Sequence, residues 1–168
     1  MSVLVILIFL CFIRDSHIPL FFQGDLSNLA INIPATNLLP DSIAISCGSS
    51  GSLSTLDGHV WMGDSGFQST FLLQINGKPS SSRPIHELTS FDYVPCNTAR
   101  ASRQTSSYVF QVKPGQKFIR LHFYQDSYKG FKRSEALFTV RAGPYTLLRN
   151  FSSSLAADDQ GAKHIIKE

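Results

Sequence analysis

The sequence predicts an all-β fold, a β-sandwich formed by a single domain. Short segments of alternating or β-branched residues recur between turn residues, and no segment has a convincing helical period with caps. The 168 residues suffice for one core of moderate size. With 43% hydrophobic and only 16% charged residues, the composition excludes a disordered chain, and no collagen triplets or coiled-coil heptads occur.

The first strand of the domain is expected at Ser42–Ser46, where polar and apolar residues alternate. The sequence Cys47–Gly51 ends it with turn residues. A second turn is predicted at Asp57–Gly58, ahead of a short strand at Val60–Met62. The segment Asn76–Pro84 combines glycine, prolines and serines and predicts a loop.

The strongest pattern predicts a β-hairpin between residues 107 and 125. Tyr108, Phe110 and Val112 share one face of its first strand, Pro114–Gly115 forms the turn, and Phe118–Tyr124 returns. The returning strand has one apolar face and one face that mixes aromatic and basic groups. The apolar face carries Ile119, Leu121 and Phe123, and the mixed face carries Arg120, His122 and Tyr124.

The last third of the chain predicts three more strands. Ala136–Arg141 and Tyr145–Leu148 flank a turn at Gly143–Pro144. Ala162–Glu168 has the pattern of a strand that begins and then stops. We therefore expect a sandwich that is incomplete at its C-terminus, with exposed edges and an apolar face.

The N-terminus predicts a secretory signal peptide over residues 1–24. The eleven apolar residues Val3–Ile13 are too few for a membrane-spanning helix and fit the h-region of a signal. No Lys or Arg precedes them and no clean cleavage site follows, so a buried first strand or an uncleaved anchor stays open. Residues 25–41 are interpreted as a lead-in segment and residues 42–168 as the domain, which would be secreted or held at the cell surface.

An oxidising compartment permits two modifications. Cys47 and Cys96 could form one disulfide if their Cα atoms lie close enough. Asn150 begins the sequon Asn150–Ser152 and is a candidate glycosylation site.

Positive charge is concentrated in the middle of the chain. The net charge of the whole chain is +3, but residues 78–149 hold twelve Lys or Arg and four Asp or Glu, a net charge of +8. A basic surface could meet nucleic acid, anionic lipid or an acidic polymer, or could simply be solvated.

Catalytic constellations are absent or weak. The five histidines are scattered, no phosphate-binding glycine loop occurs, and no cofactor or metal is expected. Asp57 and Asp64 flank Trp61 as a carboxylate pair would in a glycoside hydrolase, but turn capping explains them better. An enzyme is therefore disfavoured.

Carbohydrate binding needs only exposed aromatic faces and a few polar groups. Aromatic residues in a β-sandwich are more often part of the core, so this interpretation competes with a structural one. The aromatic candidates are Trp61, Tyr93, Tyr108, Tyr124, Tyr128 and Tyr145.

Five ordered motifs resemble one known family. The chain is similar to the malectin-like ectodomain of plant FERONIA-type (Catharanthus-type) receptor-like kinases over residues 42–168, as an N-terminal fragment. Two departures are Cys96, where the family usually has Tyr, and His59, where Arg is usual. The motifs are Ser42–Ser50, Asp57–Asp64, Val94–Arg100, Tyr108–Tyr124 and Gly143–Ser152.

The resemblance implies a malectin fold, a jelly-roll-like β-sandwich that faces the cell wall at the plasma membrane, without the kinase domain of the full-length relatives. It implies a carbohydrate-binding module for pectin, with small secreted peptides and a co-receptor as further partners and no nucleic acid. A truncated receptor fragment without binding activity is the alternative. Arginine pairs well with carboxylates, so the predicted contacts to an acidic polysaccharide are mainly basic. They are Arg100, Arg103, Lys117, Arg120 and Lys129, with Tyr124 and Tyr128 as stacking partners.

Overall fold

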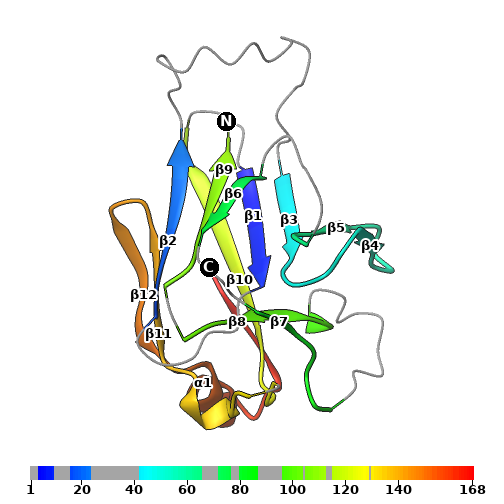
Figure 1. Cartoon of the computed structure of the whole chain (residues 1–168), viewed down its shortest axis with the longest axis vertical. Coiled ribbons are helices and arrows are strands. Elements are labelled where there is room, and N and C mark those ends of the chain that lie inside the picture. The colour runs from blue at the N-terminus through cyan, green and yellow to red at the C-terminus, as the bar shows by residue number, and fades with distance from the viewer. Residues whose placement is uncertain are drawn as a thin grey trace.

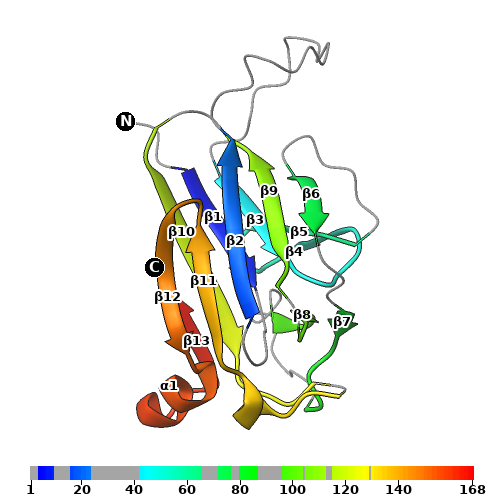
Figure 2. The ribbon, with the colours of Figure 1, turned by 60° about the vertical axis from the view of Figure 1, so that its left-hand side comes forward.

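The computed structural model confirms the all-β class. It describes residues 4–9, 16–23, 42–65, 72–76, 80–86, 96–103, 105–112, 115–128 and 130–168. Two β-sheets face each other, and a small two-stranded sheet and one helix lie toward one end (Figure 1, Figure 2). Buried side chains of both sheets form the core between them, as expected for a sandwich.

The first sheet has six strands in the order β13-β10-β1-β3-β5-β4. β1 runs parallel to both of its neighbours, whereas β13 and β4 pair antiparallel at the two edges. The strands are β1 (Leu4–Phe9), β3 (Ser42–Ser46), β4 (Ser52–Ser54), β5 (Val60–Gly63), β10 (Lys117–Tyr124) and β13 (His164–Lys167).

The second sheet has five strands in the order β12-β11-β2-β9-β6. β11 and β12 form an antiparallel hairpin around Gly143, whose φ of 55° suits a glycine turn and confirms the predicted turn. The strands are β2 (Ser16–Gln23), β6 (Leu72–Asn76), β9 (Ser107–Gln111), β11 (Phe138–Ala142) and β12 (Tyr145–Phe151).

A third, smaller sheet pairs β7 (Ser80–Ser82) with β8 (Ala99–Ala101). A second hydrophobic cluster of Cys96, Ala99, Tyr124 and Tyr128 joins β8 to the end of β10. The face of β10 that mixes aromatic and basic groups is therefore partly covered, and its His122 is only 7% exposed.

The predicted hairpin between residues 107 and 125 is wrong in its pairing, although both of its strands exist. β9 belongs to the second sheet and β10 to the first, so the chain crosses the sandwich between them. The physical reason is burial: Tyr108 and Phe110 of β9 and Leu121 and Phe123 of β10 all enter the core from opposite sheets. A flat hairpin would place these four side chains in one layer.

The structure also contains a helix that the sequence analysis missed, α1 (Ser153–Gln160). Ser152 caps its N-terminus by accepting a hydrogen bond from the Leu155 backbone, and Gly161 ends it with a left-handed φ of 59°. Only Ser153, Ser154 and Ala157 are buried, so the helix has no apolar stripe that a periodicity search could detect. The cap residues were the available signal.

The N-terminal segment supplies backbone to both sheets in the intact chain. β1 lies between β10 and β3, and β2 lies between β11 and β9. Whether residues 1–24 are removed as a signal, as predicted, or stay as a buried first strand or an uncleaved anchor stays a prediction. Residues 25–41 lie outside the described residues. Within the described part of the chain, no helix has the length and apolar character needed to cross a membrane.

Candidate binding groove

A polar groove of about 770 Å³ lies between the edge of the first sheet and the small third sheet. This volume is within the range of small-ligand sites in proteins. Three chain segments form the groove: the β3–β4 turn, the stretch from β7 onward, and the residues before β8. The lining residues are Gly48, Ser49, Ser50, Leu53, Ser81, Ser82, Arg83, Pro84, Ile85, Asn97 and Thr98.

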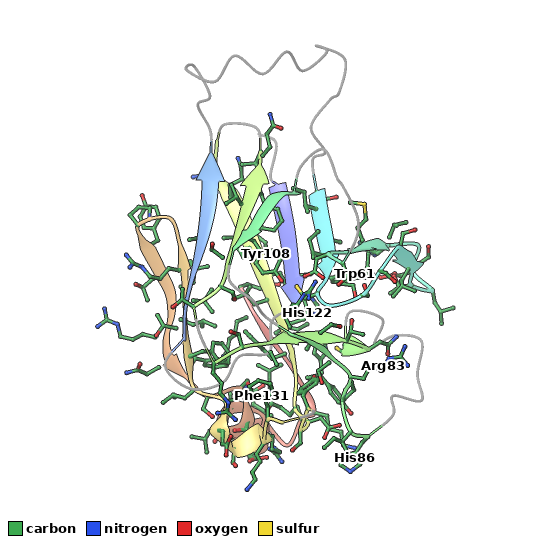
Figure 3. All side chains as sticks on the ribbon, viewed as in Figure 1. Trp61, Arg83, His86, Tyr108, His122 and Phe131 are labelled. Atoms are coloured by element: carbon green, nitrogen blue, oxygen red, sulfur yellow. The ribbon has the colours of Figure 1, made fainter. Side chains whose placement is uncertain are left out.

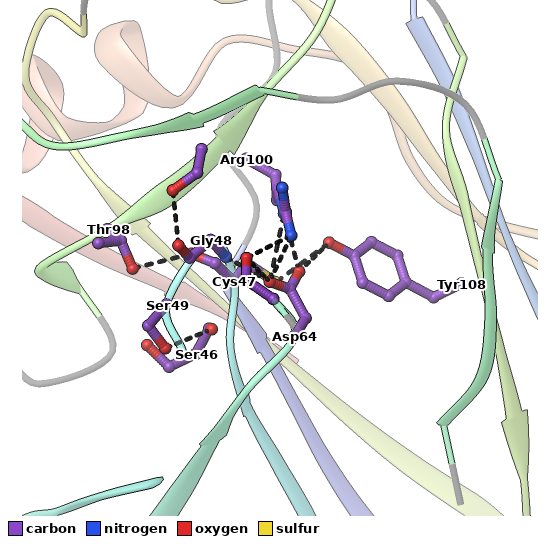
Figure 4. A network of polar contacts seen from close by, with 10 residues as sticks. Ser46, Cys47, Gly48, Ser49, Asp64, Thr98, Arg100 and Tyr108 are labelled. Atoms are coloured by element: carbon purple, nitrogen blue, oxygen red, sulfur yellow. Dashed lines mark hydrogen bonds and ion pairs between the residues drawn. The ribbon is translucent and has the colours of Figure 1, made fainter. Parts of the chain in front are cut away.

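A buried carboxylate holds the β3–β4 turn in place. The Asp64 side chain is fully buried, and its Oδ1 accepts a 2.7 Å hydrogen bond from the Gly48 backbone N–H (Figure 4). On the opposite side of the groove, the Ser81 hydroxyl donates to the Gly48 carbonyl, and Thr98 Oγ1 donates to the Cys47 carbonyl at 3.0 Å. The turn is thus tied to both of the other segments that form the groove.

Gly48 is the residue that permits this close approach. Its φ is 84°, and a Cβ there would lie 2.8 Å from Ser81 Oγ and 2.9 Å from the Ala99 carbonyl oxygen. Any other residue would meet both backbone strain and a steric clash.

The charge of Asp64 is balanced by Arg100. The guanidinium donates to Asp64 from Nε at 3.1 Å and from Nη2 at 2.9 Å, and only 14% of the Arg100 side chain is exposed. Burial alone would lower the pKa of Arg100, but the hydrogen bonds and charge of Asp64 outweigh it and raise this pKa. Tyr108 donates a further hydrogen bond to Asp64 Oδ2 at 2.8 Å. Burial, followed by the nearby Cys47 and Asp64, raises the pKa of Tyr108 well above its ordinary value.

A second carboxylate positions the opposite wall. Asp126 accepts a hydrogen bond from the His86 backbone at 2.7 Å and contacts His86 Nδ1 at 2.9 Å. The Ile85 N–H donates to the Ser127 carbonyl at 3.0 Å, which fixes the residues that follow Arg83. Burial would raise the pKa of Asp126, but the hydrogen bonds from His86 and Ser127 prevail and lower it. Figure 3 shows Arg83 and His86 on this segment.

The groove chemistry suits a hydroxyl-rich ligand that carries negative charge. Serine and threonine hydroxyls and the Asn97 amide can both donate and accept hydrogen bonds. The exposed Arg83 adds a guanidinium that matches carboxylate geometry. Leu53 and Ile85 offer apolar surface for the C–H groups of such a ligand.

The basic residues predicted from the sequence occupy different environments. Arg100 forms the buried ion pair with Asp64. Arg103 is 59% exposed and lies over the Phe131 ring, with its carbon Cζ 5.0 Å from the ring centroid. Lys117 donates to the Gly115 carbonyl at 2.9 Å, and Arg120 is paired with Glu168. Lys129 lies outside the described residues.

The two tyrosines proposed as stacking partners lie inside the molecule. Tyr124 is 6% and Tyr128 2% exposed, and both pack in the second hydrophobic cluster beside Cys96. Their rings present no open face to a ligand here, which agrees with the competing interpretation of these aromatics as core. Trp61 and Tyr108 are buried too, whereas Tyr145 is 72% exposed. Tyr93 lies outside the described residues.

The possible disulfide between Cys47 and Cys96 is not formed. Both residues are buried thiols that pack in different clusters, Cys47 in the main core and Cys96 in the second cluster. Burial raises the pKa of the Cys96 thiol far above its ordinary value, which makes it unreactive. The predicted glycosylation residue Asn150 is exposed on β12, and its modification stays a prediction.

The carboxylate pair suggested by Asp57 and Asp64 does not form a hydrolytic site. Asp57 closes an exposed turn with Thr55 and His59, whose hydrogen bonds lower the pKa of Asp57 to about 2. Asp64 is engaged by Arg100 in the interior. Among the described residues, no three His, Cys, Asp or Glu side chains gather in a way that could hold a metal ion.

Sequence reasoning missed the groove itself. The predicted loop Asn76–Pro84 is wrong at Ser80–Ser82, which form β7 because they pair with β8. Asn97 and Thr98 belong to the motif Val94–Arg100 but are not among the predicted contacts. The clustering of Ser80–Ser82 with Arg83 was the available signal, but it does not reveal which segments meet in space.

The chain is similar to receptor-like kinases of Arabidopsis thaliana. It is 38% identical over 145 residues to the receptor-like protein kinase FERONIA, which covers 85% of this chain and 16% of FERONIA. It is 29% identical over 150 residues to the receptor-like protein kinase ANXUR1, which covers 89% of this chain and 17% of that protein. No family model matches the chain.

Solved structures show the same relationship. The crystal structure of the plant receptor-like kinase FER superimposes with a TM-score of 0.63 at 38% identity, and the match covers 74% of this chain and 32% of that one. The ANX1 ectodomain from Arabidopsis thaliana gives a TM-score of 0.55 at 25% identity, covering 74% and 31%. The chain thus spans about a sixth of the curated relatives and a third of the solved chains. The matched part lies in the ectodomain and does not include the kinase domain.

Proposed function

Because this chain is homologous to the malectin-like ectodomains of the FERONIA and ANXUR receptor-like kinases, we propose that it is an extracellular ligand-binding module for an acidic cell-wall polysaccharide of the pectin type. The observation that carries the proposal is the groove, where the guanidinium of Arg83 stands among hydroxyls and an amide. A uronate residue offers a carboxylate to Arg83, hydroxyls to the serines, and C–H surface to Leu53 or Ile85.

The rigidity of the groove supports binding by a preformed site. The Asp64–Arg100 pair fixes one wall and Asp126 fixes the other, so a ligand would not have to order these segments. Ordering flexible segments on binding would reduce the affinity. Arg103 and Lys117 remain proposed contacts for a polymer that extends beyond the groove.

Titration calorimetry with de-esterified oligogalacturonate tests the proposal. Arg83→Gln should weaken binding about tenfold or more, because a hydrogen bond to a charged group contributes about 1.5–3 kcal/mol. The matched control is Arg149→Gln, which removes an exposed arginine from β12 on the other sheet and should leave affinity unchanged.

Two further conditions test the role of charge. Affinity should fall as salt concentration rises, because exposed ion pairs are screened. A fully methyl-esterified oligosaccharide should bind more weakly than the acid form. Equal binding of both forms, or equal affinity of Arg83→Gln and the unmodified chain, would contradict the proposal.

A further inference from the structure

A row of rings crosses the outer face of the first sheet and ends at the groove. Trp61 of β5 meets His122 of β10 edge to face, with ring centroids 5.4 Å apart and an interplanar angle of 88° (Figure 3). His122 stacks in turn on His164 of β13, with centroids 5.1 Å apart. At the other end, Trp61 pairs across the strands with Leu53, which lines the groove.

A short contact between ring nitrogens also joins the two histidines. His122 Nδ1 lies 3.0 Å from His164 Nε2, a distance at which one nitrogen donates its proton and the other accepts it. If both rings are protonated, both nitrogens carry protons and the hydrogen bond is lost. His122 Nε2 is buried without a hydrogen-bond partner, so a proton added there would find no acceptor.

The charged surroundings also disfavour a second positive charge. On β10 the nearest charge is Arg120, which is paired with Glu168 at the end of β13. β13 contributes His164, while its Lys167 lies over the Phe151 ring on the other face. β5 (Val60–Gly63) contributes no titratable group. Burial, then His164 and Arg120, lowers the pKa of His122 to about 3, and burial lowers the pKa of His164.

We propose that the His122–His164 pair is an acid-sensitive clasp, and that its protonation displaces Trp61 and loosens the groove wall at Leu53. This regulation rests on the proposed function of the groove. Trp61 is 5% exposed and His122 7% exposed, so a charged His122 must move toward solvent or admit water. Either movement removes the support of Trp61, and Leu53 loses its cross-strand neighbour.

The intrinsic fluorescence of the full chain reports on the clasp directly, because Trp61 is its single tryptophan. A protonated imidazole quenches indole emission more strongly than a neutral one. Acidification from pH 6.5 toward about 3, the value to which burial lowers the pKa of His122, should therefore produce an emission change that His122→Gln abolishes and the exposed control His59→Gln preserves. His164→Gln should move the midpoint to higher pH, because it removes a neighbouring positive charge.

The outcomes decide the proposal even if one variant fails to fold, as judged by circular dichroism. If His122→Gln does not fold, the shift in the pH midpoint of the emission change in His164→Gln tests the clasp instead. The same emission profile in the unmodified chain and in folded His122→Gln, or an unshifted midpoint in His164→Gln, would overturn the clasp.

Oligogalacturonate affinity links the clasp to the groove. At the pH of the emission midpoint, the apparent Kd of the unmodified chain should be about twofold weaker than that of His122→Gln at the same pH, because half of the molecules have lost the binding conformation. Using one ligand at one pH cancels the protonation of the ligand itself. Equal Kd values would overturn the coupling. No binding at pH 7 by any variant would instead refute the proposed function, while the emission change would still test the clasp.

Discussion

Replacing Asp64 should destabilise the chain more than any surface substitution, because three groups depend on its carboxylate. Asp64→Asn keeps the shape of the side chain but removes the charge that faces Arg100 and places amide protons near its donors. The Gly48 N–H and the Tyr108 hydroxyl donate to different oxygens of Asp64. Because asparagine has a single side-chain oxygen, one of these two donors would lose its acceptor. Breaking a buried ion pair by removing one partner costs about 3–5 kcal/mol.

Equilibrium unfolding in urea measures this loss. A double-mutant cycle with Arg100→Met isolates the pair, because the double variant leaves no uncompensated buried charge. We expect the double variant to lose less free energy of unfolding than the two single variants lose together, by about 0.5–3 kcal/mol. A loss below about 1 kcal/mol for Asp64→Asn, or strictly additive losses, would refute the assignment of this pair as the support of the groove.

Three further predictions concern the N-terminus, the thiols and pH. A chain without residues 1–24 lacks β1 and β2, each of which pairs with a strand on both sides. It should therefore unfold at a lower urea concentration than the full chain. An unchanged urea midpoint would show that these strands contribute nothing to stability. Dithiothreitol should not change the melting temperature, since Cys47 and Cys96 form no disulfide, and a shift would contradict this. The free energy of unfolding should fall as pH decreases from about 6.5 toward 3. The reason is that His122 is protonated at its ordinary pKa in the unfolded chain, but only near pH 3 in the folded chain. This contribution amounts to about 4 kcal/mol and should be absent in His122→Gln.

The strands β3, β5 and β9 to β13 were predictable because their signals are local. The predicted strand at Ser42–Ser46 coincides with β3, and the turn at Gly143 with the β11–β12 hairpin. Each depends on residues next to one another in the chain, where alternation and turn chemistry act directly. The short helix α1 shows the limit, since its caps are local but its apolar pattern is weak.

The sequence by itself determined the class of the fold, the positions of β3, β5 and β9 to β13, the concentration of positive charge and the family resemblance. Only the tertiary structure decided that β9 and β10 lie in different sheets, that Arg100 neutralises Asp64, and that Tyr124 and Tyr128 are core residues. The physical reason is that alternation specifies which side chains share a face, but not what covers that face. Gly48, Ser81 and Asn97 are far apart in the chain, and they line one groove only because the sheets bring their segments together.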